Sequence, residues 1–145
     1  MSDPLYRLEV LRLAADATGA GRLPNPHGTY MAHNPACSDR TTVDVIVEDG
    51  RVKTVAHDTK ACVLAQASAS ILAGALPGHG LKELEKLRAE MAGMFAGGDA
   101  PKAPFGAYGI LRDVGGFPSR HTCVFLPIEA ALKAFADSQK REPAG

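Results

Sequence analysis

The sequence lacks the features that would point to a membrane, a nucleic acid or a secreted disulfide scaffold. Lys plus Arg and Asp plus Glu each number 16, so no net charge is available to attract nucleic acid or an anionic membrane. The N-terminal stretch MSDPLYRLEVLRLAADATG is interrupted by charges and has no apolar run typical of a signal peptide, and no other stretch approaches a membrane span. We therefore expect a cytoplasmic protein without nucleic-acid or membrane partners.

Cysteines are few as well: the chain has only Cys37, Cys62 and Cys123. An odd number, widely spaced, in a reducing compartment argues against a disulfide framework. The composition of the whole 145-residue chain, 46% hydrophobic and 22% charged, is ordinary for a globular protein. It predicts one domain, residues 1–145, that buries a core without disulfide bonds or a structural metal.

The clearest structural signal is a β-hairpin. Val43, Val45 and Val47 alternate with other residues, and Asp49-Gly50 supplies a turn that tolerates positive φ at both positions. Residues 51–58 form the returning strand, and residues 29–33 begin a further short strand. The sequence therefore predicts a small antiparallel sheet of about three strands.

Helical patterns surround this hairpin. Residues 4–18 place Leu5, Leu8 and Leu11 at helical spacing, and the uncharged, small-residue stretch 62–76 predicts a helix packed closely on a sheet. Further helices are predicted over 80–95 and 128–141, with a loop over 96–109. The order predicts an α+β fold in which the sheet packs against several helices.

Each cysteine lies at a boundary between predicted elements. Cys37 precedes the first hairpin strand, Cys62 opens the small-residue helix, and Cys123 precedes the last helix. Asp39 adds an oxygen ligand beside Cys37, and His121 offers an imidazole beside Cys123. These donors would suffice for tetrahedral Zn²⁺ or a [2Fe–2S] cluster.

A simpler interpretation remains open at this point. With no Cys-x-x-Cys pair, spacing alone favours inert, buried thiols. His121 would then be a loop residue, and Asp39 would close a turn. The other four histidines show no metal spacing and are interpreted as surface or turn residues: His27, His33, His57 and His79.

Several motifs, taken in order, resemble the iron–sulfur cluster assembly scaffold family, the IscU/SufU/NifU N-terminal-like proteins. They are NPACSD, VEDGRV, CVLAQASAS and RHTC, and the resemblance spans roughly residues 5–138. It implies an IscU/SufE-like fold and a scaffold rather than a conventional enzyme. Such a protein accepts persulfide sulfur from a cysteine desulfurase, adds iron, holds a transient [2Fe–2S] cluster and passes it to carrier or apo-protein acceptors.

The resemblance also assigns residue roles. Cys37, Cys62 and Cys123 would be thiolate ligands and Asp39 the labile oxygen ligand, with His121 as an alternative ligand. Cys123 is the candidate persulfide acceptor, on a loop that could swing. Zn²⁺ would bind the same ligands in an isolated sample.

The chain departs from the family pattern at four places. Ser38 and Ala61 replace glycines, and Thr122 stands where a histidine precedes the third cysteine. The Pro-Pro-Val-Lys chaperone-binding segment is replaced by GGFPSR, which argues against a chaperone interaction. Arg120 resembles the zinc-binding, SufU-type branch.

Two other functions are therefore weighed against the scaffold. One is a zinc-dependent or Cys-nucleophile sulfurtransferase with His121 as base, which would need a substrate pocket that the sequence does not display. The other is a degenerate regulatory binding module, which the three substitutions favour and the retained cysteines and Asp39 disfavour.

Overall fold

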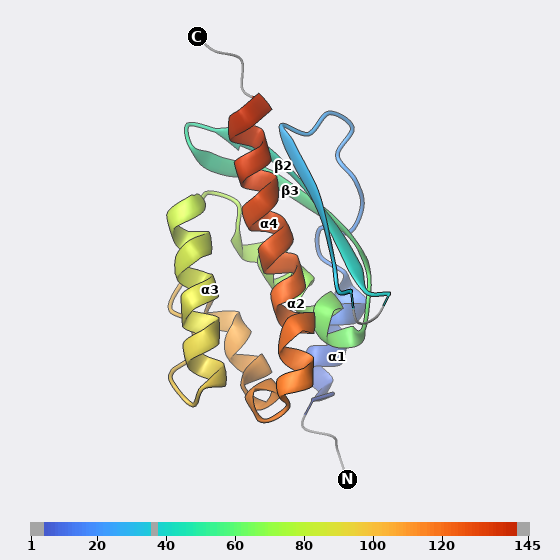
Figure 1. The fold of residues 1–145 in the computed structure, drawn as a ribbon, viewed down its shortest axis with the longest axis vertical. Helices are drawn as coiled ribbons and strands as arrows, with labels where there is room; N and C mark the ends of the chain where they lie inside the picture. The colour runs from blue at the N-terminus through green and yellow to red at the C-terminus, as the bar shows by residue number, and fades with distance from the viewer. Residues whose placement is uncertain (1–4, 36–37, 142–145) are drawn as a thin grey trace.

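The computed structural model describes residues 5–35 and 38–141. It confirms the α+β prediction: three antiparallel strands in the order β1-β2-β3 pack against helices (Figure 1). The elements are α1 (Leu8–Asp16), β1 (Gly28–His33), β2 (Arg40–Glu48), β3 (Arg51–Lys60), α2 (Val63–Ala75), α3 (Leu81–Phe95), the 3₁₀ helices η1 (Gly106–Gly116) and η2 (Pro118–Arg120), and α4 (His121–Arg141).

The predicted hairpin is confirmed. Asp49 and Gly50 connect β2 to β3 with φ angles of 53° and 73°, the left-handed pair that matches the twist of the strands. On β2, Val43 and Val45 are fully buried, as alternation predicts. Val47 follows an irregularity in the strand register and is only partly buried.

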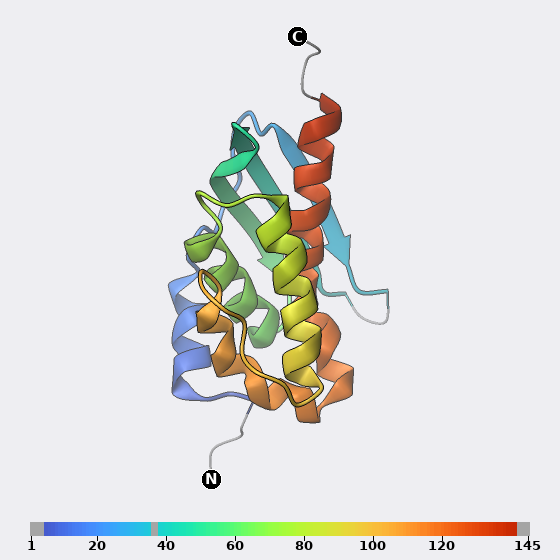
Figure 2. The ribbon, with the colours of Figure 1, turned by 90° about the vertical axis from the view of Figure 1, so that its left-hand side faces the viewer.

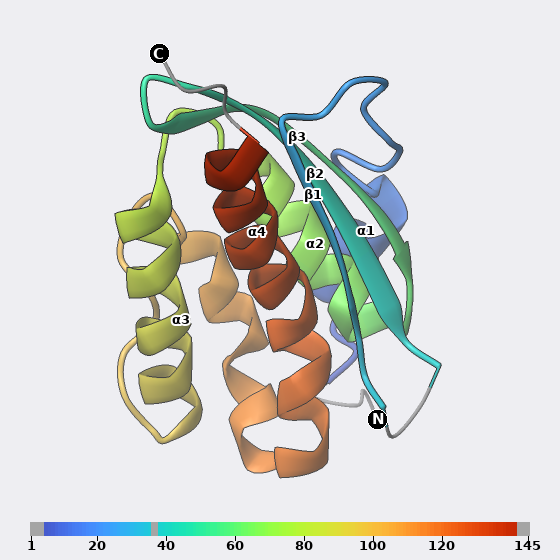
Figure 3. The same ribbon diagram turned by 45° about the horizontal axis from the view of Figure 1, so that its top comes forward.

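Helices α2, α3 and α4 lie on one side of the sheet (Figure 3). α4 packs along β1 and β2, α2 contacts β3 and α4, and α1 packs against α2. The approach of β1 to α4 is so close that a Cβ at Gly28 would meet the Ala134 carbonyl oxygen at 2.0 Å. Glycine at this position therefore sets the spacing between strand and helix.

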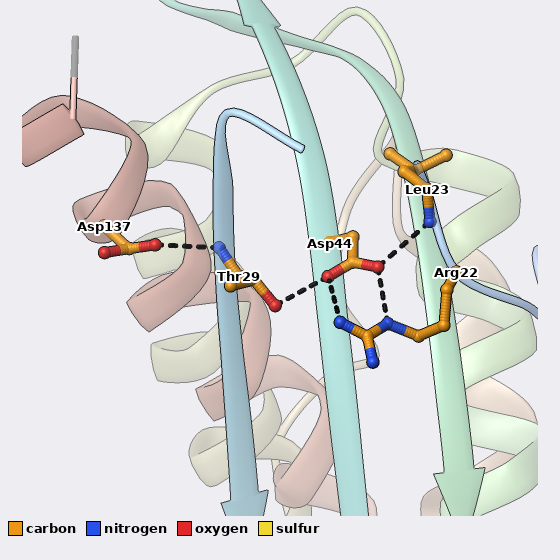
Figure 4. Close-up of polar contacts among 5 residues, drawn as sticks. All are labelled: Arg22, Leu23, Thr29, Asp44 and Asp137. Atoms are coloured by element: carbon orange, nitrogen blue, oxygen red, sulfur yellow. Dashed lines mark hydrogen bonds and ion pairs between the residues drawn. The ribbon is translucent and has the colours of Figure 1, made fainter. Parts of the chain in front are cut away.

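The other face of the sheet is partly covered by the segment between α1 and β1. Its anchor is the fully buried carboxylate of Asp44, which accepts hydrogen bonds from Arg22 Nε at 2.7 Å, Leu23 N at 3.0 Å and Thr29 Oγ1 at 2.6 Å (Figure 4). Burial pushes the pKa of Asp44 upward, but these donors outweigh it and hold the pKa below its usual range. Asp137 of α4 accepts a hydrogen bond from Thr29 N at 3.0 Å, so β1 is held from both sides.

The predicted start of the last helix, residue 128, is wrong. α4 begins at His121, so Pro127 lies inside it. Proline normally disfavours a helix interior because it lacks an N–H and crowds the carbonyl four residues earlier. Here Val124 and Ile128 are fully buried at helical spacing on either side of the proline, and this burial outweighs the local cost.

Two further expectations need correction. Leu8 and Leu11 are 56% and 42% exposed, because α1 buries Val10 instead. The predicted loop 96–109 ends in η1, which lies between α1 and α3 (Figure 2). No helix in the described part of the chain is long and apolar enough to cross a membrane.

Candidate metal centre

Four segment ends meet at one end of the sheet, the lower end in Figure 1: the starts of β2, α2 and α4 and the end of β3. Asp39 precedes β2, Cys62 follows β3, and Cys123 lies in the first turn of α4. One ligand atom from each of these three residues lies within 4.8 Å of the other two. Cys37, the remaining predicted ligand, lies outside the described residues.

Asp39 and Cys62 are joined by a hydrogen bond. Cys62 is the N-cap of α2, the position predicted for it, and its side chain makes no cap hydrogen bond. Its backbone N–H donates to Asp39 Oδ2 over 3.4 Å, so the carboxylate lies at the positive end of the helix. Both residues are partly exposed, which leaves them accessible from solvent.

Cys123 is the buried member of the group, with 5% of its surface exposed. Its thiol faces Asp39 Oδ2 at 4.0 Å. Burial, together with Cys62 and Asp39 beside it, raises the pKa of the Cys123 thiol to about 11, and Arg120 opposes the shift. The expectation that Cys123 lies on a swinging loop is wrong, because the residue lies within α4.

His121 is held away from this group. Its ring stacks on Phe95 with ring centroids 4.5 Å apart, and its Nε2 donates to the Gly115 carbonyl over 3.2 Å. Among the described residues the metal-competent group contains Asp39, Cys62 and Cys123 and does not include His121.

Buried hydrogen bonds fix the turn that carries Cys123. Ser68 Oγ on α2 donates to the Val124 carbonyl over 2.7 Å, and the Tyr108 hydroxyl donates to the Ser68 carbonyl over 2.8 Å. Burial raises the pKa of Tyr108 far above its usual range, so this hydroxyl stays protonated. The small-residue stretch of α2 therefore positions the first turn of α4, which carries Cys123. This agrees with the close packing expected of that stretch.

Sequence reasoning gave Arg120 no role beyond marking a branch of the family. In the structure the pKa of Arg120 is raised by Tyr6, against the opposing effect of burial, and further by Cys123 and Cys62, so its charge is coupled to both described thiols. A cation here opposes the electrostatic cost of thiolates. Its position three residues before Cys123, one helical turn, is the signal that could have indicated this.

The interpretation of His57 as a surface or turn residue is wrong. His57 is 3% exposed; its Nε2 donates to the Thr18 carbonyl over 2.8 Å, and its Nδ1 lies 2.8 Å from Thr59 Oγ1. A carbonyl can only accept, so the neutral ring carries its proton on Nε2. Burial lowers the pKa of His57, while Thr18 and Asp58 oppose the shift.

The donor set fits a metal ion. Tetrahedral Zn²⁺ with bonds of about 2.3 Å to sulfur separates its sulfur donors by roughly 3.7 Å, so a group within 4.8 Å needs only a small contraction. Thiolates suit zinc and iron–sulfur units, whereas a carboxylate is a harder ligand. Two thiols and one carboxylate on three different elements thus form a site that requires the folded chain.

Comparison with known proteins agrees with this fold. The family described as the NifU-like N-terminal domain matches residues 5–107. The chain belongs to this family, which confirms the resemblance drawn from the sequence motifs.

Two curated relatives are iron–sulfur cluster assembly scaffold proteins IscU. The Thermotoga maritima protein is 27% identical over 132 residues, covering 89% of this chain and 93% of its own. The Streptococcus pyogenes protein is 26% identical over 145 residues, covering 93% and 91%. The crystal structure of a nitrogen-fixing NifU-like protein (N-terminal) from Brucella abortus superposes with a TM-score of 0.91 at 28% identity, covering 97% of this chain and 98% of that one.

Proposed function

We propose that this protein is a scaffold on which an iron–sulfur cluster is assembled and then transferred to other proteins. The observation that carries the proposal is the juxtaposition of Asp39, Cys62 and Cys123 within 4.8 Å at one end of the sheet. Membership of the NifU-like N-terminal domain family and the similarity to two IscU scaffolds support it. In this role the cluster is cargo, and the chain supplies its ligands.

The ligands of the cluster would be Cys37, Cys62, Cys123 and Asp39. Three thiolates hold a transient [2Fe–2S] unit, and the carboxylate supplies one harder, weaker bond. A storage site would close with four thiolates, whereas a donor site needs a bond that exchanges easily. The mixed donor set therefore suits delivery better than storage.

Cys123 is the proposed sulfur acceptor. Its thiolate attacks the outer sulfur of a persulfide on a cysteine desulfurase, so that a new S–S bond forms as the old one breaks and the desulfurase cysteine leaves as thiolate. An external reductant then supplies the two electrons that convert each transferred sulfur to sulfide. Because Cys123 is 5% exposed, the first turn of α4 must open for this attack.

The partners of such a cycle are a cysteine desulfurase and an iron–sulfur carrier or apo-protein acceptor. The chain would hold and pass on the product without turning over a substrate by itself. Zn²⁺ would compete for the same donors, and a zinc-bound form would act as a sulfur acceptor of the SufU type.

The test is an anaerobic reconstitution. The purified protein is analysed for bound zinc and iron, then given a cysteine desulfurase, cysteine, a reductant and Fe²⁺ while the visible spectrum is recorded. We expect a cluster chromophore that is lost on Cys→Ser substitution at 37, 62 or 123. Ser119→Ala, at an exposed site in η2, is the matched control.

The outcomes separate the candidate functions. A chromophore that the three serine variants retain would contradict the proposed ligands. Persulfide acceptance with bound zinc and no chromophore would identify the zinc-dependent sulfur acceptor. A protein that neither binds metal nor accepts persulfide would instead be a regulatory module.

A further inference from the structure

Three basic residues form a row across all three strands beside the metal centre. His33 of β1 lies opposite Arg40 of β2, and Arg40 lies opposite Lys60 of β3. Directly opposed residues of antiparallel strands project from the same face of a sheet. The alternate position Thr41 is buried towards the helices, so the row projects from the other face, where all three residues are exposed.

This row carries an electrostatic cost. Like charges placed directly opposite each other across two strands are destabilising. In residues 5–35 and 38–141, no carboxylate lies within 4.0 Å of Arg40 or Lys60, although the described chain forms ion pairs elsewhere. Asp58, opposite Thr42 on the same face, forms no ion pair with either cation.

Edge protection does not account for the arrangement. Proteins place lysines and arginines on edge strands to prevent unwanted pairing with other sheets. Arg40, however, lies on β2, the central strand. Its position in the chain is more informative: Arg40 directly follows Asp39, and Lys60 is two residues before Cys62, so both cations lie within two residues of a member of the metal centre.

We propose that the row His33–Arg40–Lys60 is a docking site for an acidic segment of the protein partner that exchanges sulfur or cluster with the adjacent centre. This inference rests on the proposed function and adds the chemistry of the partner. Carboxylates would pair with Arg40 in a bidentate manner and with Lys60 as a point charge. Docking there would offset the like-charge repulsion and present the partner beside Asp39 and Cys62.

An acidic protein fits this surface better than a nucleic acid does. The chain has no net charge, and a nucleic-acid site needs a wide positive field that tracks many phosphates. Two cations, Arg40 and Lys60, with the polar His33 beside them in one line, match a short acidic segment. Complementary charge of this kind speeds association and fixes orientation.

The first arm of the test uses an acetylated hexaglutamate peptide as the probe, titrated into ¹⁵N-labelled protein at low salt of about 10 mM and at about 1 M salt. We expect amide shifts around His33, Arg40 and Lys60 that disappear at high salt. Arg40→Glu with Lys60→Glu should weaken binding by roughly tenfold or more. The matched control, Lys82→Glu with Lys86→Glu, reverses two exposed charges on α3 and should leave the affinity within about twofold.

Three results in this arm would overturn the proposal. They are equal weakening in both double variants, absence of binding at low salt, and tighter binding of a thymidine hexanucleotide than of the peptide. Zinc binding and circular dichroism establish that the charge-reversed protein is folded. Arg40→Gln with Lys60→Gln, which removes charge without reversing it, should fall between wild type and the reversed variant.

The second arm compares two routes to a loaded centre. Arg40→Glu with Lys60→Glu should slow sulfur acceptance from a cysteine desulfurase by roughly tenfold and leave reconstitution from inorganic sulfide and Fe³⁺ unchanged, because only the first route needs docking. Normal desulfurase-dependent rates in this variant would refute the docking site. A wild-type protein that gains no cluster by either route would instead refute the proposed function, and the peptide titration would still decide the docking surface.

Discussion

The sulfur of Cys123 lies 4.0 Å from Oδ2 of Asp39, across 84 positions of the sequence. The same oxygen accepts the backbone N–H of Cys62 at 3.4 Å. One carboxylate oxygen thus faces both described cysteines, and its replacement is the most direct test of the mixed donor set.

Asp39→Cys should convert a donor site into a storage site. A fourth thiolate in place of the carboxylate makes every bond to the cluster soft, so transfer to an apo-ferredoxin should slow by roughly tenfold or more. The transfer is followed by the change in visible circular dichroism. Asp99→Cys adds a cysteine at an exposed loop position and should leave the rate unchanged. Equal transfer rates in wild type and Asp39→Cys would show that Asp39 is not the exchangeable ligand.

Metal binding should release a proton from Cys123. With a pKa of about 11, this thiol is protonated in the metal-free protein throughout the neutral range and must lose its proton to bind. We expect zinc affinity to rise about tenfold per pH unit for each proton released. Competition with a chelator measures the affinity, and calorimetry in buffers of different ionisation enthalpy counts the protons. Cys123→Ser should bind zinc more weakly and release one proton fewer; an affinity independent of pH would contradict this.

His57 should make the stability depend on pH on the acid side of neutrality. Its folded pKa lies below the unfolded value of about 6.5, so the unfolded chain takes up a proton first as the pH falls. The contribution of His57 to the free energy of unfolding should therefore be constant above a pH of about 6.5. It should decrease as the pH falls from there to the folded pKa. Urea unfolding over this pH range measures the effect.

A variant isolates the histidine contribution. His57→Ala should lower the stability by roughly 1–3 kcal/mol because two buried hydrogen bonds are lost, and should flatten the acid-side dependence. Ser119→Ala, at an exposed position whose side chain does not titrate, serves as the control and should retain the wild-type profile. An unchanged pH profile in His57→Ala would assign the dependence to other groups.

Pro127 should keep the first turn of α4 easy to open. Proline has no N–H, so the Cys123 carbonyl four residues earlier has no helical donor. Pro127→Ala should restore this hydrogen bond, stabilise the protein by up to about 3 kcal/mol and slow both amide exchange in residues 121–126 and alkylation of Cys123. Mass spectrometry of exchange and alkylation measures both.

Pro118→Ala is the matched control for this prediction. Pro118 lies at the first position of η2, where a missing N–H costs little, so its replacement changes the unfolded chain similarly without adding a helical bond. Equal slowing of Cys123 alkylation in both variants would remove Pro127 as the cause.

The sequence predicted the hairpin and the convergence of segment ends because both rest on local signals. The Asp49-Gly50 turn and the alternating valines fix the strand pairing, and the position of Cys62 marks the start of α2. The order of these elements placed Asp39 and Cys62 at the same end of the sheet. Local sequence signals were therefore sufficient to predict that Asp39 and Cys62 lie at the same end of the sheet.

What the sequence did not predict depends on tertiary contacts. Pro127 suggested a helix start, but the burial of Val124 and Ile128 extends α4 back to His121. This extension turns His121 towards Phe95 and away from the thiols. His57 was missed because nothing beside it in the sequence reveals that Thr18, 39 positions earlier, supplies its acceptor.

One periodic pattern in the sequence indicates the helix η1, although a loop was predicted over its first residues. In η1, Tyr108, Leu111 and Val114 are all buried at a spacing of three, which is the period of a 3₁₀ helix. The glycines around them favoured a loop interpretation. A search for a three-residue period would have found this element.

The donors of the metal centre also make it a reversible cross-link in the chain. An ion held by Asp39, Cys62 and Cys123 would join positions 23 and 84 residues apart. Binding only the folded state, it would raise the unfolding free energy by about 2.7 kcal/mol at a hundredfold excess over its dissociation constant. The emptied chain would then be less stable than the chain that held the cluster. Cluster release should therefore be accompanied by a loss of resistance to proteolysis.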